Sequence, residues 1–407
     1  MEIRPATADE TTDFIRTSEA AFHEDLTDDD AEMWSKLFEP ERSLAAFDGP
    51  DIVATTAIFT RELTIPGAVV SAAGVTAVGV LPTHRRRGLL TQLMRRQLDD
   101  VRAAGEPIAV LWASENAIYG RYGYGLAAQH ASITLRTTGV LAHPDLPAPS
   151  GRIVVTAPTD AVSRIAPLYD RVRRERIGHL DRAGAWWERR VRDSERYRDG
   201  RNAMRAAIHE TPGGEVDGYA LYAVKSGWQD GPNGSVFVRE LVADGPAATV
   251  AMWSYVLALD LTRTLEYWPA PPDIPFVDLL RGPNRPRIEI GQNLWIRLVD
   301  VPAALAARTY GAAVDVVVDV ADAFCPWNAG RYRLTAESPG AAATCVPTDA
   351  PADLALSATD LGAAYLGGTS LAALAGIGRV QELRPGVLEP VANAFLAARA
   401  PWCPEIF

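Results

Sequence analysis

The chain has little of what would place it in several large protein classes. Its 407 residues include three cysteines, Cys325, Cys345 and Cys403, with no metal-ligand spacing, so neither a disulfide framework nor a cysteine metal site is expected. The six histidines include no pair at helical ligand spacing, and we expect no metal. No run of eighteen apolar residues exists, so we expect no membrane span and no membrane partner. The N-terminus lacks the order of a secretory signal, which predicts a cytoplasmic location.

Positive charge is also in short supply. The chain has 40 lysines and arginines against 51 aspartates and glutamates, a net charge of −11. Because the phosphate backbone requires a basic surface, this balance argues against nucleic acid as a partner. It favours cationic ligands, which an acidic cleft attracts. The length predicts two or three domains, and 48% hydrophobic residues with 22% charged residues are typical of a soluble globular protein.

The most informative segment is residues 78–90, VGVLPTHRRRGLL. A β-rich run stops at Pro82, three arginines follow from Arg85 to Arg87, and a helix is expected to begin at Gly88. The free N–H groups and the dipole of a first helical turn favour anions, and we expect Gly88 to let the backbone approach a ligand closely. A solvated helix start is the alternative, although three cations there oppose the dipole unless an anion binds.

A second segment, residues 113–125, follows a strand expected at Ile108 to Trp112. It reads ASENAIYGRYGYG and sets tyrosines between glycines beyond the end of a strand, where the crevices of α/β folds open. A phenol, with a reference pKa of about 10, is a suitable proton donor for a departing thiolate. The alternative is that Tyr119, Tyr122 and Tyr124 are packing aromatics with a polar tip.

The organisation of the chain changes after about residue 140. The proline-rich stretch 144–150 indicates a linker, and a second unit begins at Arg152. Strands expected at 218–224 and 235–243, followed by a helix at about 247–259, repeat the order of the first domain. The loop before this helix contains no arginine. A duplicated domain that has lost its cofactor loop is one interpretation, and chance recurrence of a common α/β order is the other.

Two further regions have weaker signals. Residues 171–201 mix arginines with aromatic rings, which could be a surface for single-stranded nucleic acid. The interspersed acids favour the alternative of two amphipathic helices. After Pro286, strands expected at 295–299 and 314–320 begin a third unit, a small α+β module.

These features together resemble the enhanced intracellular survival family, a group of aminoglycoside N-acetyltransferases in the GNAT superfamily. The arginine loop is similar to the superfamily's pyrophosphate motif through Arg85, Gly88 and Leu90, with Leu90 standing where a small residue is usual. The tyrosine run, the arginine-free second unit and the aromatic chain end complete the resemblance, which covers the whole chain.

The resemblance implies a fold and an assembly. The expected fold class is α/β (α+β), with a catalytic GNAT domain at 1–145 and a degenerate GNAT-like domain at 146–287 that lacks the cofactor loop. A sterol-carrier-like α+β domain at 288–407 ends in the catalytic carboxylate. Acetyl-CoA is the implied co-substrate, a small-molecule amine the implied partner, and a homohexamer the implied assembly. Antibiotic resistance is the implied biological role.

The resemblance also assigns roles to residues of this chain. Tyr119 matches the general acid, and the α-carboxylate of Phe407 matches the general base. A free carboxylate has a reference pKa of about 3.5, and burial would raise it toward useful basicity; a tail packed for stability is the alternative. The substrate cleft would draw on Phe22, Glu24, Asp25 and Trp34. Acetyl-CoA would contact Val78, Val80, Arg85, Arg86, Arg87, Gly88, Leu89, Leu90, Thr91, Ser114 and Glu115.

The sequence therefore predicts an acetyl-CoA-dependent N-acetyltransferase. The expected reaction is direct attack on the thioester by an amine of a polycationic small molecule such as an aminoglycoside. One alternative is an acyltransferase for peptide or protein amines. Another is a non-catalytic protein whose C-terminal module binds an apolar ligand.

Overall fold

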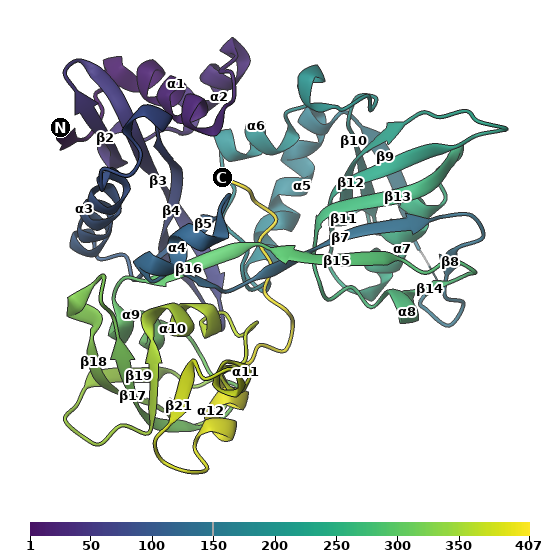
Figure 1. The fold of residues 1–407 in the computed structure, drawn as a ribbon. Helices are drawn as coiled ribbons and strands as arrows, with labels where there is room; N and C mark the ends of the chain where they lie inside the picture. The colour runs from purple at the N-terminus through teal and green to yellow at the C-terminus, as the bar shows by residue number, and fades with distance from the viewer. Residues whose placement is uncertain (149) are drawn as a thin grey trace. The chain divides into compact units, whose positions relative to one another are not determined.

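A computed structural model describes residues 1–148 and 150–407 and divides them into two compact units. Unit 1 contains Met1–Ala128 and Asn293–Phe407, and unit 2 contains Gln129–Gln292. Both ends of the chain therefore build the same unit (Figure 1). The predicted linker at 144–150 includes Pro149, which lies outside the described residues.

The main sheet of unit 1 has seven strands in the order β1-β2-β3-β4-β5-β16-β6. Its only parallel pair within the described residues is β4 with β5, joined by helix α3, while the neighbours on either side pair antiparallel. A turn at Pro66-Gly67, a pair typical of turns, joins β3 to β4. The bounds are β1 Glu2–Arg4, β2 Ser43–Asp48, β3 Asp51–Ile65, β4 Ala68–Val80, α3 Leu89–Ala103, β5 Ile108–Trp112, β6 Gly125–Leu126 and β16 Leu294–Leu298.

Helices cover both faces of this sheet because apolar residues alternate along its strands. In β2, Ala45 and Phe47 pack with Phe14 of helix α1 (Thr11–Phe22). Leu44 and Ala46, which point the other way, pack with Leu89 and Leu93 of α3. A shorter helix, α2 (Asp28–Leu37), follows α1. Apolar residues at helical spacing give α3 one buried face, formed by Leu89, Leu93, Met94, Leu98 and Val101, and Leu90 beside it is half-buried.

Strand β16 enters the first sheet from far along the sequence. It pairs antiparallel with β5, from Leu294 opposite Trp112 to Leu298 opposite Ile108, and also with β6. We expected a strand near 295–299 to open the third unit, and it instead completes the first sheet. Conversely, β7 (Gln129–Arg136), which falls within the predicted first domain, pairs with strands of unit 2. The predicted domain limits stay predictions.

Unit 2 has a second seven-stranded sheet in the order β15-β7-β13-β12-β11-β10-β9. As in unit 1, antiparallel strands lead into a parallel pair, β12 with β13, connected through helix α7. Strands β8 (Leu141–Ala142) and β14 (Leu280–Arg281) form a separate pair. The remaining bounds are β9 Arg152–Thr156, α5 Pro158–Arg173, α6 Ala185–Val191, β10 Arg205–Glu210, β11 Val216–Lys225, β12 Gly234–Ala243, α7 Pro246–Leu257, β13 Thr262–Ala270, α8 Phe276–Leu279 and β15 Arg287–Gln292.

The arginine-rich region 171–201 contains the end of α5, the helix α6 and a 3-10 turn at Glu195–Tyr197. Its arginines pair with nearby acids, as Arg173 does with Asp170 at 2.7 Å and Arg198 with Asp193 at 3.1 Å. Helices whose arginines are paired with acids agree with the interpretation of this region as amphipathic helices.

The C-terminal module of unit 1 is a five-stranded sheet in the order β19-β18-β17-β20-β21 with short helices. In the described part of the chain, no helix is both long enough and apolar enough to cross a membrane. The module's elements are α9 Val301–Ala307, β17 Val314–Ala321, β18 Gly330–Ala336, β19 Ala343–Pro347, β20 Leu354–Ser357, α10 Ala358–Ala364, α11 Leu371–Gly376, β21 Val380–Glu382 and α12 Leu388–Phe395.

Candidate functional site

The parallel strands of unit 1 separate partway along their length. β4 and β5 are paired from Ala72 opposite Ile108 to Gly74 opposite Val110, and β4 then continues to Val80 without β5 as a partner. A bulge lies just beyond the separation, where Ala77 has φ +51 and the register with β3 shifts. Bulges re-aim strands beside functional sites. Here the bulge accompanies an opening between two buried strands.

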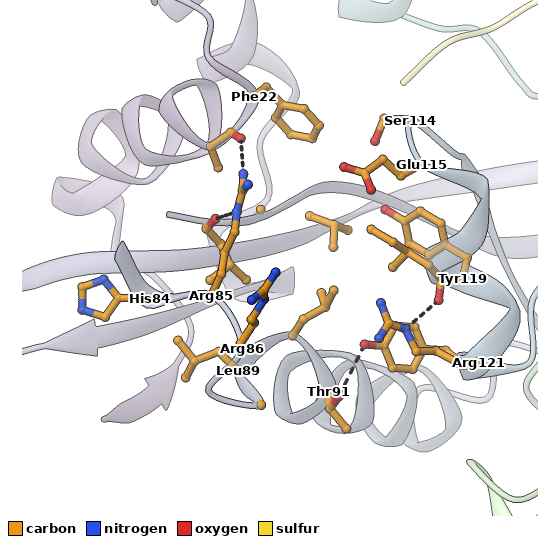
Figure 2. A pocket seen from close by; sticks show the side chains of 18 of the residues that line it. Phe22, His84, Arg85, Arg86, Leu89, Thr91, Ser114, Glu115, Tyr119 and Arg121 are labelled. Carbon is orange, nitrogen blue, oxygen red and sulfur yellow. Dashed lines mark hydrogen bonds between the residues drawn. The ribbon is translucent and has the colours of Figure 1, made fainter. Parts of the chain in front are cut away.

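A cavity of about 630 Å³ extends from this opening to the start of α3 (Figure 2). Its volume is in the range of small-molecule sites. The structure brings together most of the residues that the sequence pointed to: Phe22, Val78, Val80, Arg85, Arg86, Gly88, Leu89, Leu90, Thr91, Ser114, Glu115 and Tyr119. Arg87, Glu24, Trp34 and Phe407 are not among the lining residues, and their roles stay predictions.

The start of α3 forms an anion cradle at one end of the cavity. Gly88 caps the helix with φ +80, and the first intrahelical bond runs from the Gln92 N–H to the Gly88 carbonyl at 3.1 Å. The N–H groups of the first turn thus have no partner within the helix. A Cβ on Gly88 would meet only the Gln92 side chain, at 3.9 Å. The glycine is therefore needed for its left-handed backbone conformation, which L side chains rarely adopt.

The three exposed arginines before α3 have different surroundings. The Arg85 side chain turns back and donates to the carbonyl oxygens of Val80 at 3.3 Å and Ala21 at 3.4 Å. Arg87 donates to the Thr83 carbonyl at 3.1 Å. Arg86 lines the cavity and has neither a hydrogen bond nor an ion pair with any residue that the structure describes. No acid stands in the first turn of α3, so this end of the cavity is suited to an anion.

Tyr119 lies across the cavity from these arginines (Figure 2). It ends the short helix α4 (Asn116–Tyr119), which follows β5, and only 6% of it is exposed. Burial, together with smaller contributions from Tyr122 and Glu115, raises the pKa of its phenol to about 12. The hydroxyl therefore stays protonated at neutral pH, as a proton donor must.

The C-terminal module holds the Tyr119 segment from behind. The Thr359 hydroxyl of α10 donates to the Gly120 carbonyl at 3.1 Å, and the Phe324 ring meets Tyr122 edge-on with centroids 5.0 Å apart. Gly123, with φ +84, leaves room for the buried Arg297 guanidinium, which a Cβ there would approach within 2.0 Å. The residues directly after Tyr119 are thus held by contacts from the second segment of unit 1, Asn293–Phe407.

The last residue of the chain lies where the parallel strands separate. A Cβ on Gly74 would be 3.5 Å from a ring carbon of Phe407. The Phe407 side chain is half-buried, and the tail runs from the C-terminal module to the first sheet (Figure 1). Gly74 ends the paired part of β4, so the chain end is placed at the inner end of the opening.

Acidic residues gather on α1 and α2, next to the segment that contributes Phe22 to the cavity. Burial raises the pKa of the Glu19 carboxyl, and the nearby charges of Glu24 and Asp30 raise it further, against a hydrogen bond from Trp34. Trp34 itself stacks on Phe59, with centroids 5.8 Å apart. The predicted substrate residues Glu24 and Trp34 therefore both lie near Glu19, although neither lines the cavity.

Other lining residues were not singled out from the sequence: Ala21, His23, Gly79, His84, Ile118 and Arg121. His84 directly precedes the arginines and lies 3.1 Å from an Asp48 oxygen, so its position in the loop was an available signal. Tyr122, which also lines the cavity, was already part of the tyrosine run that the sequence indicated. Ala21 and His23 had no local signal, because they reach the cavity only through the packing of α1 on β4.

Three protein-family models match successive parts of the chain. A protein-family model described as an acetyltransferase (GNAT) domain matches residues 2–127, and a second model with the same description matches residues 178–298. A model described as a sterol carrier protein domain matches residues 301–404. The predicted fold class, two GNAT domains followed by a sterol-carrier-like domain, is confirmed.

Similar proteins extend over nearly the whole chain. An uncharacterised N-acetyltransferase from Streptomyces avermitilis is 45% identical over 93% of this chain and 92% of its own length. N-acetyltransferase Eis from Mycobacterium tuberculosis is 30% identical over 92% of each chain. Among solved structures, Eis1 from Mycobacterium abscessus is 31% identical and superposes with a TM-score of 0.86, covering 100% of both chains.

Proposed function

The chain belongs to the Eis-like family of GNAT N-acetyltransferases, and on that basis we propose that it transfers the acetyl group of acetyl-CoA to an amine of a polycationic small molecule such as an aminoglycoside. That it is an acetyltransferase follows from its family. The proposal concerns the cofactor contacts, the amine class and the residues that move protons.

The anion cradle supports a diphosphate at the start of α3. The N–H groups of its first turn and the unpaired guanidinium of Arg86 would hold the diphosphate oxygens. The unpaired stretch of β4, with Val78 and Val80 in the cavity wall, would bind the pantetheine arm. When bound, acetyl-CoA supplies a thioester carbonyl that an amine can attack. Within the described residues, the single observation that carries the proposal is this cavity, with a cation-rich helix start at one end and a protonated phenol at the other.

Two groups of the chain would move protons in the reaction. As the amine nitrogen bonds to the acetyl carbon, the carboxylate of Phe407 accepts the amine proton, directly or through water. As the carbon–sulfur bond breaks, Tyr119 donates its phenolic proton to the departing sulfur. The raised pKa of Tyr119 keeps that proton in place at neutral pH. The position of Phe407 at the inner end of the opening supports its part in the reaction.

The choice of a polycationic amine rests on charge. Glu19, Glu24 and Asp30 form an acidic group beside Trp34, close along the chain to Phe22 in the cavity wall. Clefts rich in one sign of charge concentrate ligands of the opposite sign, and a tryptophan face adds attraction for cations. A substrate with several ammonium groups would satisfy both.

Extension of the C-terminus tests the terminal base. Two residues appended after Phe407 convert its carboxylate to a peptide carbonyl, which cannot accept a proton. We expect turnover to fall by on the order of 10² or more, as for loss of a general base. Thermal stabilisation by CoA should remain, because the cradle is untouched. The same two residues added before Met1, which is exposed, are the control. A terminal extension with full turnover contradicts the proposal.

A further inference from the structure

A buried asparagine grips the backbone of the C-terminal tail. Asn293 is fully buried, and its Nδ2 donates to the Cys403 carbonyl at 2.9 Å. Its Oδ1 accepts from the Cys403 N–H, also at 2.9 Å. One side-chain amide thus satisfies both backbone groups of one residue, as a neighbouring strand would. Both partners belong to unit 1.

Asn293 is itself fixed to the elements that carry the active site. Its N–H donates to the Ala128 carbonyl at 3.1 Å, in the segment that follows the tyrosine run. The next residue, Leu294, begins β16 and lies opposite Trp112, the last residue of β5. The tail is therefore anchored at the start of β16, which pairs with β5, the strand that leads to the Tyr119 segment.

The anchor lies close to the chain end. Upstream, the Ala397 N–H donates to the Gly367 carbonyl at 3.1 Å, ten residues before Phe407. Cys403 is only four residues before Phe407, and four residues span at most about 14 Å when extended. Fixing Cys403 therefore restricts where the terminal carboxylate can go.

We infer that Asn293 is a positioning residue for the carboxylate of Phe407, an inference that rests on the proposed function in which this carboxylate is the base. Asn293 does not line the cavity; it acts through the tail. Without the grip on Cys403, the last residues sample more positions, and the carboxylate spends less time where it can accept the amine proton. Small losses of alignment lower catalytic rates steeply. Acetyl-CoA binding is unaffected, because the cradle residues do not change.

The test compares two buried asparagines. Asn293→Leu removes both hydrogen bonds to Cys403. Asn293→Asp keeps an oxygen that can accept from the Cys403 N–H and, when ionised, has no donor for the Cys403 carbonyl. The matched control is Asn328→Leu. Asn328 is 1% exposed and also bridges backbone groups, with Nδ2 donating to Leu298 at 3.0 Å and Oδ1 accepting from Val301 at 3.1 Å, away from the tail.

For Asn293→Leu we expect kcat to fall about tenfold or more, while KM for acetyl-CoA stays within about twofold. Asn293→Asp should show an intermediate fall in kcat. Carboxypeptidase A should release residue 407 several times faster from the Asn293 variants than from the unmodified chain, because the tail is loosened. Asn328→Leu should lower the melting temperature comparably and leave both kcat and the release rate unchanged.

Two outcomes overturn the inference. One is an Asn293 variant with full kcat and an unchanged release rate; the other is an equal loss of kcat in Asn328→Leu, which would make the effect one of general stability. If Asn293→Leu does not fold, Asn293→Asp and its release rate decide. The C-terminal extension distinguishes failure of the proposed function from failure of this inference. Full turnover after the extension contradicts both the terminal base and the role of Asn293. An inactive extended chain together with a fully active Asn293→Leu contradicts only the role of Asn293.

Discussion

The two seven-stranded sheets share a bulge in the strand before the crossover helix, but the bulge leads to a cavity in unit 1 and to a buried ion-pair cluster in unit 2. In each sheet, the strand before the crossover helix has a bulge beyond the part that pairs with its parallel neighbour. The first residue after the bulge that again pairs with the antiparallel neighbour is Gly79 in β4 and Glu240 in β12. Beyond the bulge, unit 1 opens into a cavity of about 630 Å³ that Gly79 lines. In unit 2, Glu240 is fully buried between Arg182 and Arg190 and also accepts from Tyr219. At equivalent places beyond the bulge, unit 1 therefore has a glycine in a cavity wall and unit 2 has a paired, buried carboxylate.

The starts of the crossover helices differ in the same sense. Helix α3 is preceded by three arginines and capped by Gly88. Helix α7 is capped by Gly245 and begins with Pro246, which has no N–H to offer an anion. Asp244, just before it, pairs with Arg171 at 2.7 Å. The start of α7 is thus less suited to an anion than the start of α3, because it lacks the arginines, lacks one N–H and has an acid beside it.

The largest effect on stability is expected from breaking the buried cluster of Glu240, Arg182 and Arg190 in unit 2. Burial alone would raise the pKa of Glu240, but Arg182 and Arg190 outweigh it and hold the pKa below its usual range. Glu240→Ala leaves both arginines buried without their carboxylate, which should cost about 3–5 kcal/mol in the free energy of unfolding. Urea denaturation measures this. Asp244→Ala, which breaks an exposed pair, should stay within about 0.5 kcal/mol.

The result for Glu240→Ala also bears on the comparison itself. CoA should still stabilise unit 1 of this variant, because the anion cradle at the start of α3 belongs to unit 1 and is unchanged. If Glu240→Ala instead unfolds no more easily than Asp244→Ala, the buried cluster does not hold unit 2 together and the contrast with the open site loses its energetic basis.

The next effect concerns the phenol in the open site. Tyr119→Phe keeps the ring and removes the proton, so kcat should fall on the order of 10², equivalent to about 2.7 kcal/mol, with CoA binding unchanged. Tyr124→Phe is the control. Tyr124 is fully buried, packs edge-on against Tyr119 at 5.9 Å, and its hydroxyl has no partner among the described residues. Steady-state kinetics that show equal losses for the two variants would assign the effect to packing.

A smaller effect is expected at the cradle. Arg86→Ala removes the one cavity-lining guanidinium without a partner within the described residues, and we expect CoA to bind about tenfold more weakly, or about 1.4 kcal/mol. Calorimetry at several salt concentrations should show a weaker salt dependence than in the unmodified chain. Arg96→Ala is the control, because Arg96 is an exposed arginine of α3 itself and already pairs with Asp100 at 2.9 Å. Equal affinities for CoA in both variants would remove Arg86 from the site.

Local signals predicted the functional half of the fold well. The strand at Ile108 to Trp112 and the helix after Gly88 are where the sequence indicated, because a short apolar run and a periodic stripe bounded by glycine define them. The arginine loop and Tyr119 also reached the same cavity. Each of these features depends on contacts close along the chain.

Long-range packing limited the rest. The apolar run of β16 indicated a strand but not that its partner would be β5, because strand pairing leaves no mark in either sequence alone. His23 lines the cavity only because α1 packs closely on β4, where a Cβ on Gly79 would lie 2.7 Å from that of Ala21. The grip of Asn293 on Cys403 had no sequence signal, since a lone asparagine before a strand is commonplace.

The position of β16 has a consequence for how the chain is made. During synthesis, β5 leaves the ribosome with one edge unpaired, and its antiparallel neighbour follows only after the whole of unit 2. At about 5–20 residues per second, the roughly 180 residues between them take on the order of 10–40 s. Through that interval the nascent first domain has an apolar edge that invites mispairing. Because unit 2 ends at Gln292, it is complete before β16 is synthesised and can fold before the first sheet receives its missing strand.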